Sequence, residues 1–138
     1  MSTTAEDFTH QFAQSLDLSP EAIPTVRGIV RAHLGLWDLS ALSHDVALCL
    51  SELLSNVVKH TDSPYCVIVI QYFADSLRVA VSDTDPTPPV VLRPDFLAES
   101  GRGMALIDRT ADTWGVDRTP DGKRVWFELR TAATAVRP

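Results

Sequence analysis

Glu52 and Asn56 stand out in the segment SELLSNVVKHT, residues 51–61, which is otherwise rich in residues that favour burial. A spacing of four residues puts both side chains on one face of a helix, so a carboxylate and an amide oxygen would project together. Asn is a hard oxygen ligand that suits a magnesium ion, and Glu can accept a proton from water or a hydroxyl. The alternative, which the local pattern alone favours, is the solvated side of an ordinary amphipathic helix.

Asp83 follows the apolar run LRVAV, at the point where a strand pattern ends. A buried carboxylate in that position can accept a hydrogen bond from an exocyclic amino group, which is how it would select adenine. An Asp that only opens a turn occurs in the same sequence context. Asp83 taken alone therefore leaves both interpretations open.

Gly101, Arg102 and Gly103 lie in SGRGMALI, where a loop enters an apolar helical pattern. The glycines let the backbone approach a ligand closely, the helix start offers unpaired N–H groups, and the arginine adds a cation. This combination suits phosphate groups. Loops that enter helices also contain glycine for conformational reasons alone, so the order of the three groups along the chain is more informative than any one of them.

Composition limits the classes of function. The chain has 138 residues, a hydrophobic share of 45%, a charged share of 22% and a formal net charge of -6, as expected of one soluble globular domain. Its scattered basic residues do not suit a nucleic-acid backbone, so no direct nucleic-acid partner is expected. No apolar run has the length of a membrane span and the start does not resemble a signal peptide, so we expect no membrane contact and a cytoplasmic location. Cys49 and Cys66 lack metal-site spacing and are expected to be buried free thiols.

Hydrophobic periodicity predicts the helices that carry these groups. The first spans residues 21–37 with a start signal at Pro24, and the second spans residues 41–60 with Ser40 as its N-cap. A third begins at Gly103 and runs to residue 112. The helix that bears Glu52 and Asn56 has the strongest pattern, and Asp83 falls between it and the third helix.

β-branched runs bounded by turn residues predict strands at residues 6–16, 65–73, 77–83, 113–118 and 123–130. Because the helices do not alternate strictly with the strands, we expect an α+β fold. It would be a two-layer sandwich, with one mixed, mostly antiparallel sheet and about three helices on one face. Residues 1–138 would form a single domain with a loose tail from about residue 131.

Four segments in this order resemble a known family: ELLSNVVKH, VSDTDPTPP, GRGMALIDRTADTWGV and DGKRVWFEL. Together they resemble the Bergerat-type ATP-binding fold shared by gyrase-type ATPases, Hsp90 and histidine kinases. Within that fold, the chain is most similar to the small anti-sigma-factor serine kinases of bacteria, in the form abundant in actinomycetes. The resemblance covers nearly the whole chain.

The resemblance implies roles for the residues that match the family's motifs. These are Glu52 as general base, Asn56 as magnesium ligand, Asp83 as adenine contact, and Gly101, Arg102 and Gly103 as part of the lid and phosphate cradle. It also implies a serine/threonine kinase that binds ATP and Mg2+, phosphorylates an anti-anti-sigma antagonist protein, sequesters a sigma factor and forms a homodimer. The loop of residues 84–100 would be the nucleotide lid.

Two residues depart from the family's pattern. Asp85 stands where relatives usually have Gly, and Arg124 stands where they commonly have a small Thr. Either could narrow the nucleotide pocket, Arg124 only if its side chain points inward. They motivate an alternative, a catalytically weak or inactive binding module that acts by protein contacts alone. The catalytic half of a sensor histidine kinase is disfavoured, because the sequence offers no helix pair for dimerisation.

Overall fold

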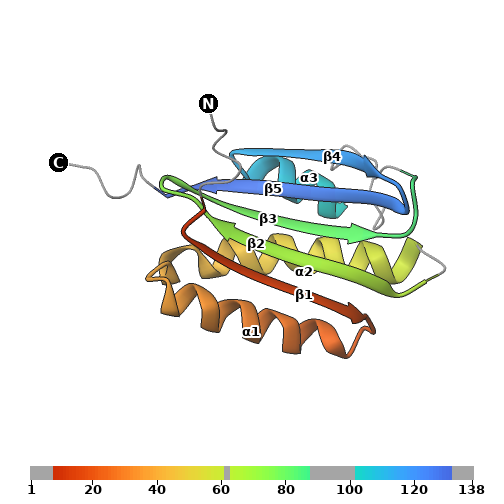
Figure 1. Ribbon diagram of the computed structural model, residues 1–138, viewed down its shortest axis with the longest axis horizontal. Coiled ribbons are helices and arrows are strands. Elements are labelled where there is room, and N and C mark those ends of the chain that lie inside the picture. Colours follow the sequence, from red (N-terminus) through yellow and green to blue (C-terminus); the bar gives the residue numbers. More distant parts are fainter. Residues whose placement is uncertain (1–7, 61–62, 88–101, 132–138) are drawn as a thin grey trace.

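The computed structural model describes residues 8–60, 63–87 and 102–131 (Figure 1). Its elements are, in chain order, β1 His10–Asp17, α1 Ala22–Leu36, the 3-10 turn η2 Ser40–Leu42, α2 Ser43–His60, β2 Tyr65–Tyr72, β3 Ser76–Asp83, α3 Arg102–Thr110, β4 Thr113–Thr119 and β5 Gly122–Arg130. The order of helices and strands is the one that the sequence predicts. The expected tail beyond residue 131 and most of the expected lid lie outside the described residues.

One five-stranded sheet, with strand order β1-β2-β3-β5-β4, forms the first layer. Every neighbouring pair is antiparallel, so the expectation of a mixed sheet is wrong for the described strands. β2–β3 and β4–β5 are hairpins, whose partners are antiparallel by construction. β1–β2 and β3–β5 are antiparallel as well, although helices lie between them in the sequence. The Phe73 N–H donates to the Ser76 carbonyl at 2.8 Å to close the first hairpin, as the sequence predicts.

Helices α2 and α3 lie behind the sheet in Figure 1 and form the second layer, with α1 beside α2. The buried side chains of α2 include Val46, Leu50 and Leu54, each with 0% exposure, and they pack in one cluster with the inward residues of the strands. By length and composition alone the segment Ser40–Lys59 could cross a membrane. Its packing against the sheet is that of a core helix.

Three local expectations need correction. Ser40 begins the short 3-10 turn η2 instead of capping α2, which starts at Ser43. The apolar pattern that predicts the first helix includes Ile29, yet Ile29 is 38% exposed, whereas Val26, Val30 and Leu34 are buried. The first strand begins at His10, several residues later than predicted, and it forms one edge of the sheet.

Candidate functional site

The groups singled out from the sequence come from elements that meet at one end of the sheet. β3 ends at Asp83, and β5 begins beside it, because Asp83 pairs with Lys123 across the two antiparallel strands. α2 ends at this side and α3 begins there, on the right in Figure 1. We call this the Asp83 end. An end of a sheet where two helix termini and two strand termini meet is a common place for a ligand site.

Asp83 is buried, and its carboxylate already has a cationic partner. The Lys123 ammonium lies 3.0 Å from Asp83 Oδ2 and 3.1 Å from Oδ1, and the two side chains are only 8% (Lys123) and 6% (Asp83) exposed. The Asp85 N–H donates to Asp83 Oδ1 at 2.9 Å, and the Asp85 carbonyl accepts from Lys123 at 2.9 Å. The burial expected of an adenine-contact carboxylate is therefore present, together with an ion pair that the sequence did not lead us to expect.

Gly122 lets the first residue of β5 pass close to the end of β3. A Cβ at this position would lie 2.0 Å from the Asp83 carbonyl oxygen and 2.7 Å from backbone atoms of Thr84. Only a residue without a side chain fits there without displacing the backbone. This close approach brings the next residue, Lys123, into reach of the Asp83 carboxylate.

Glu52 and Asn56 both lie in the C-terminal half of α2 and are partly buried, whereas Lys59, on the same polar arc, is exposed. Ser51, beside Glu52, donates to the Ala47 carbonyl at 2.7 Å and accepts from Arg27 of α1 at 3.2 Å. A purely solvated stripe would be exposed along its length. The partial burial of this part of the helix face is consistent with a site wall.

The position of Asn56 along α2 places it near the start of α3. The Thr110 side chain is close enough to the Cys49 thiol to affect its pKa, so the end of α3 lies beside the first half of α2. The two helices run in opposite directions (Figure 1). With a rise of about 1.5 Å per residue, Asn56 is roughly 10 Å further along α2, and the first turn of α3 is about as far back from Thr110. Asn56 is therefore level with the N-terminus of α3.

The start of α3 is only partly described. Gly101 lies outside the described residues, whereas Arg102 and Gly103 form the first two positions of the helix, and of their side chains nothing is described. The backbone N–H groups of a first helical turn have no partner within the helix and carry the positive end of its dipole. A phosphate held there would lie next to Asn56.

A magnesium ion fits this arrangement only as a companion of a bound nucleotide. Among the described residues no group of three His, Cys, Asp or Glu side chains could hold a metal ion alone. Mg2+ commonly takes one or two protein ligands and completes its octahedron with water and substrate phosphates. Asn56 would supply one amide oxygen, and the nucleotide would supply the charge.

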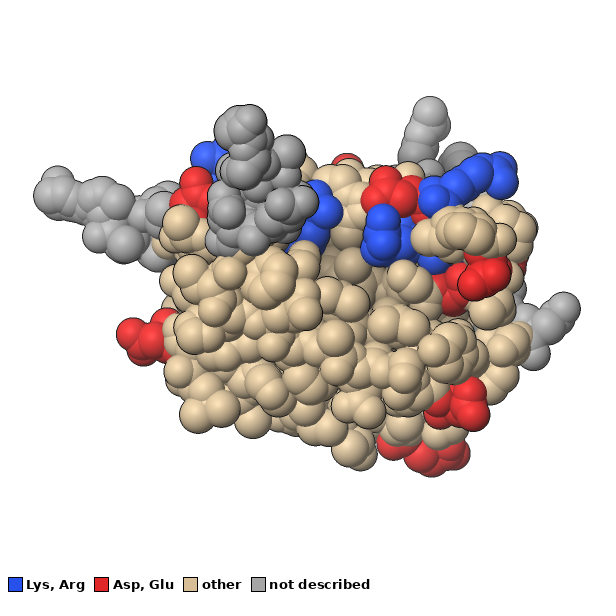
Figure 2. Space-filling model, viewed as in Figure 1, with Lys and Arg blue, Asp and Glu red and all other residues tan. Residues whose placement is uncertain are grey.

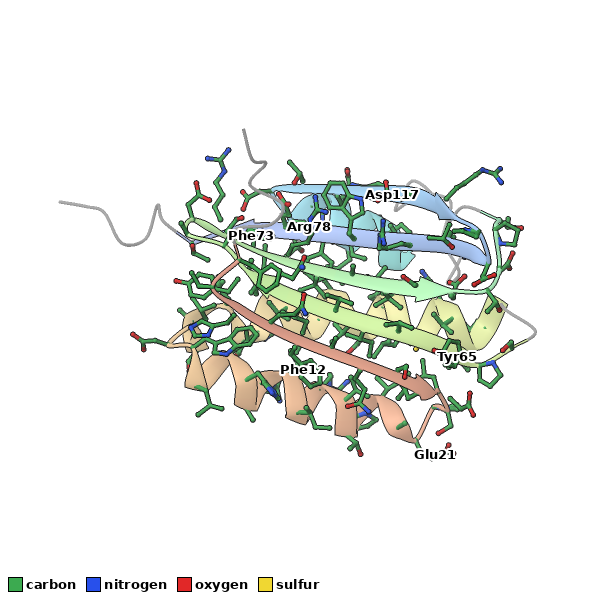
Figure 3. The ribbon with its side chains drawn as sticks, in the orientation of Figure 1. Phe12, Glu21, Tyr65, Phe73, Arg78 and Asp117 are labelled. Atoms are coloured by element: carbon green, nitrogen blue, oxygen red, sulfur yellow. The ribbon has the colours of Figure 1, made fainter. Side chains whose placement is uncertain are left out.

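The two residues that depart from the family pattern lie in different surroundings. Arg124 points away from the helices, is 46% exposed and lies 3.5 Å from Asp117 of β4, so it does not crowd the site. Asp117 projects from the open face of the sheet in Figure 3. Asp85 is part of the turn after β3, where its carboxylate accepts the Thr87 N–H at 2.9 Å.

Sequence reasoning missed Lys123, although the pattern of β5 contains the signal. Val125, Phe127 and Leu129 are all buried, whereas Trp126 and Glu128 between them are only partly buried. With a period of two, the same face continues to Lys123 and excludes Arg124. The residue after Gly122, and not the next one, is therefore the residue that faces the site.

Both cysteine thiols of the chain are buried, and one of them lies at the site. Cys66 of β2 pairs with Asp83, and burial raises the pKa of its thiol to about 11, with further contributions from the negative charges of Asp83 and Asp17. Burial likewise raises the pKa of Cys49 to about 11. Both cysteines are free, as predicted, and neither has the lowered pKa of a nucleophile.

Comparison with known proteins agrees with this geometry. Residues 16–129 match the histidine kinase-like ATPase domain, and the chain belongs to this family. An uncharacterized protein of Streptomyces coelicolor is 36% identical over 83 residues, which cover 57% of this chain and 79% of that protein. A sensor histidine kinase of Bacillus subtilis is 28% identical over 79 residues, which cover 50% of this chain and 21% of that protein. Membership of the family implies ATP binding and a regulatory role of the kinase type.

Proposed function

We propose that the protein is an anti-sigma-type regulatory serine/threonine kinase that uses Mg-ATP to phosphorylate a serine of an anti-anti-sigma antagonist. The observation that carries the proposal is the arrangement at the Asp83 end. The partly buried pair Glu52 and Asn56 lies on α2, the buried Asp83 ends β3, and α3 begins toward the same side of the sheet. The family match and the four motifs in order support the same function.

Each residue would contribute a separate part of the work. Asp83 would accept a hydrogen bond from the adenine amino group, and the first turn of α3 would hold phosphate oxygens. Asn56 would bind the magnesium ion, which neutralises phosphate charge when ATP is bound. Glu52 would accept the proton of the substrate hydroxyl while the hydroxyl oxygen bonds to the γ-phosphorus of ATP and ADP leaves.

The proposed partners are the sigma factor that the protein sequesters and the antagonist that it phosphorylates. A homodimer in the cytoplasm completes the proposal, by resemblance to the family. The net charge of -6 supports protein partners over a direct nucleic-acid partner, because phosphate backbones attract basic surfaces. The proposal includes no membrane partner.

A second candidate function is a binding module with weak nucleotide affinity that regulates transcription by protein contacts alone. The buried Asp83–Lys123 pair favours it, because the carboxylate meant for adenine already has a partner. Calorimetric titration with Mg-ATP separates the two candidates. Binding at submillimolar concentration is expected for the kinase, whereas the binding module would show none.

Glu52→Gln tests the catalytic assignment. Glutamine keeps the shape of the side chain but cannot accept the proton, so transfer of labelled phosphate to a serine on the antagonist should be abolished. Mg-ATP affinity should stay close to that of the wild type, because Glu52 is not placed on the nucleotide. If phosphate transfer survives this substitution, Glu52 is not the base. If Mg-ATP affinity is lost together with transfer, Glu52 has a structural role instead.

A further inference from the structure

The Lys123 ammonium is engaged by acceptors within the protein. It donates to Asp83 Oδ1 at 3.1 Å and to the Asp85 carbonyl at 2.9 Å, and it lies 3.0 Å from Asp83 Oδ2. An ammonium has donors and no acceptor, so it cannot bind the amino group of a base. Lys123 and such an amino group are thus donors for the same acceptor.

The Asp83 carboxylate is also engaged by protein donors. Its Oδ1 accepts from Lys123 and from the Asp85 N–H at 2.9 Å, and its Oδ2 lies 3.0 Å from the Lys123 ammonium. Oδ1 thus has two donors, and Oδ2 is the oxygen left for an amino group. An amino group that reaches Asp83 would have to share this oxygen with the ammonium.

We propose that Lys123 is an internal competitor for the adenine-contact carboxylate and thereby sets how tightly and how selectively this chain binds nucleotides. The inference rests on the proposed nucleotide site and deepens it. In the free protein the ammonium occupies the position that the base amino group needs. Nucleotide binding then includes the free energy of weakening a buried, charge-assisted contact, which lowers the affinity for ATP.

The pair is built into the backbone and is not a chance surface contact. Gly122 permits the close passage of β5, and strand pairing places Lys123 directly opposite Asp83. The adjacent Arg124 has the same charge but projects from the opposite face of the sheet, where it is 46% exposed. The chain thus contains a matched control one residue away.

Competition for Asp83 predicts a change in base selectivity when the ammonium is removed. Adenine carries an amino group where guanine carries a carbonyl oxygen. A free carboxylate accepts a hydrogen bond from the former and repels the latter. Removal of Lys123 should therefore strengthen Mg-ATP binding and widen the preference for ATP over GTP.

The experiment compares Lys123→Met with the wild type and with Arg124→Met. Methionine keeps a long unbranched side chain for packing, and both variants lose one positive charge. Calorimetry gives the dissociation constants for Mg-ATP and Mg-GTP, and thermal unfolding gives the Tm of the free proteins. In Lys123→Met we expect Mg-ATP binding to tighten roughly tenfold or more, from the strength of a hydrogen bond to a charged group.

The free Lys123→Met protein should have a Tm lower by about 10 °C, since Asp83 then lacks its partner. Arg124→Met should change neither quantity. Opposite movement of stability and affinity separates competition from a purely structural role, which would weaken both together. Lys123→Gln, which retains one donor for Asp83, is the milder variant and should lie between wild type and Lys123→Met in both measurements.

The outcomes separate this inference from the proposed function. If the wild type binds Mg-ATP and Lys123→Met and Lys123→Gln bind it no more tightly, the competition is refuted and the nucleotide site stands. An unchanged ratio of ATP to GTP affinity has the same meaning. If neither the wild type nor either variant binds Mg-ATP, the proposed nucleotide site fails and the competition with it.

Discussion

Asp83 is held by hydrogen bonds from Lys123 and from the Asp85 backbone before any nucleotide is present. Burying two charges costs several kcal/mol for each ion, and their attraction in the interior offsets that cost only when the geometry is good. A buried ion pair is consequently weak evidence for a stabilising role. We assign the pair a functional role because Asp83 is the proposed contact for the nucleotide base.

Gly122→Ala should destabilise the protein by about 3 kcal/mol, because the added methyl group meets the Asp83 backbone and the strand must shift. The matched control is Gly28→Ala in the exposed part of α1, where an added Cβ meets nothing within 4 Å. That change should stabilise the helix by roughly 0.5–1 kcal/mol. Urea unfolding of both variants measures the two opposite effects, and a Gly122→Ala protein as stable as wild type would contradict the close packing of β3 and β5.

The raised pKa of Cys66 predicts a loss of stability in alkali. In the unfolded chain the thiol ionises near its usual value of 9.0, whereas the folded protein retains the proton until about pH 11. Between these values the unfolded state releases the proton first, so the free energy of unfolding falls as pH rises, on the order of 2 kcal/mol for this thiol. Below pH 9.0 its contribution is constant.

Urea unfolding at about pH 8 and about pH 10.5 would measure the alkaline loss. Cys66→Ala should lose less stability than the wild type over the same interval, because one titrating group is gone. The comparison cancels the other groups that titrate in this range. Equal losses in the two proteins would show that this thiol ionises in the folded state as easily as in the unfolded state.

β5 shows what a strand pattern can and cannot predict. Alternation in KRVWFELR predicts a half-buried strand, and the structure confirms it. A residue at the end of a strand faces one side of the sheet or the other according to where strand pairing begins. In β5 the turn and Gly122 set the start of pairing. For that reason the sequence alone leaves open whether Arg124 faces the site, and it does not single out Lys123, the residue that does face inward.

The helix starts were harder to predict than the helix interiors. The apolar residues of α2 identify its buried face from sequence, because burial needs a period of 3.6 residues. Ser40 has the chemistry of an N-cap, yet the chain first makes a 3-10 turn that holds Leu39 and Leu42 against the core. Packing over several residues decides such a boundary, and local propensity does not contain it.

On the open face of the sheet, away from the helices, a group of side chains outside the main core links β3 to β5. Arg78 of β3 donates to Glu128 of β5 at 2.9 Å, and its guanidinium lies 4.3 Å from the ring centroid of Trp126. Trp126 of β5 lies on this open face, across from Ala80 and outside the main core. Arg78 projects from this face in Figure 3.

Arg78→Met should lower the free energy of unfolding by about 1 kcal/mol, because it removes a cross-strand ion pair and a cation–π contact while retaining part of the packing. Arg124→Met removes a longer, more exposed contact with Asp117 and should change stability by less than about 0.5 kcal/mol. Urea unfolding at low ionic strength compares the two. Equal effects would mean that the stacking on Trp126 contributes nothing.

The distribution of charge over the molecule separates its surfaces. Figure 2 shows the charged side chains of this face gathered mainly over β3, β5 and β4, whereas the central surface over β1 and β2 carries none. The outward residues of β2 are Tyr65, Val67, Val69 and Gln71. The Asp83 end, on β3 and β5, and this uncharged surface, on β1 and β2, belong to the same five-stranded sheet.

The contributing elements of the site, α2, α3, β3 and β5, pack around one core, so we expect the molecule to unfold in a single cooperative step and the nucleotide to stabilise all of it at once. At a Mg-ATP concentration of about 100 times the dissociation constant, linkage adds roughly 2.7 kcal/mol to the free energy of unfolding and should raise the Tm by about 5–10 °C.

Circular dichroism and tryptophan fluorescence should follow the same transition with and without ligand. Glu52→Gln should show the wild-type rise, whereas Asn56→Ala should lose the part that depends on magnesium. Mg-ATP could instead shift the transition seen by fluorescence and leave the one seen by circular dichroism unchanged. The site would then belong to a part of the chain that unfolds separately, and the single shared core would be contradicted.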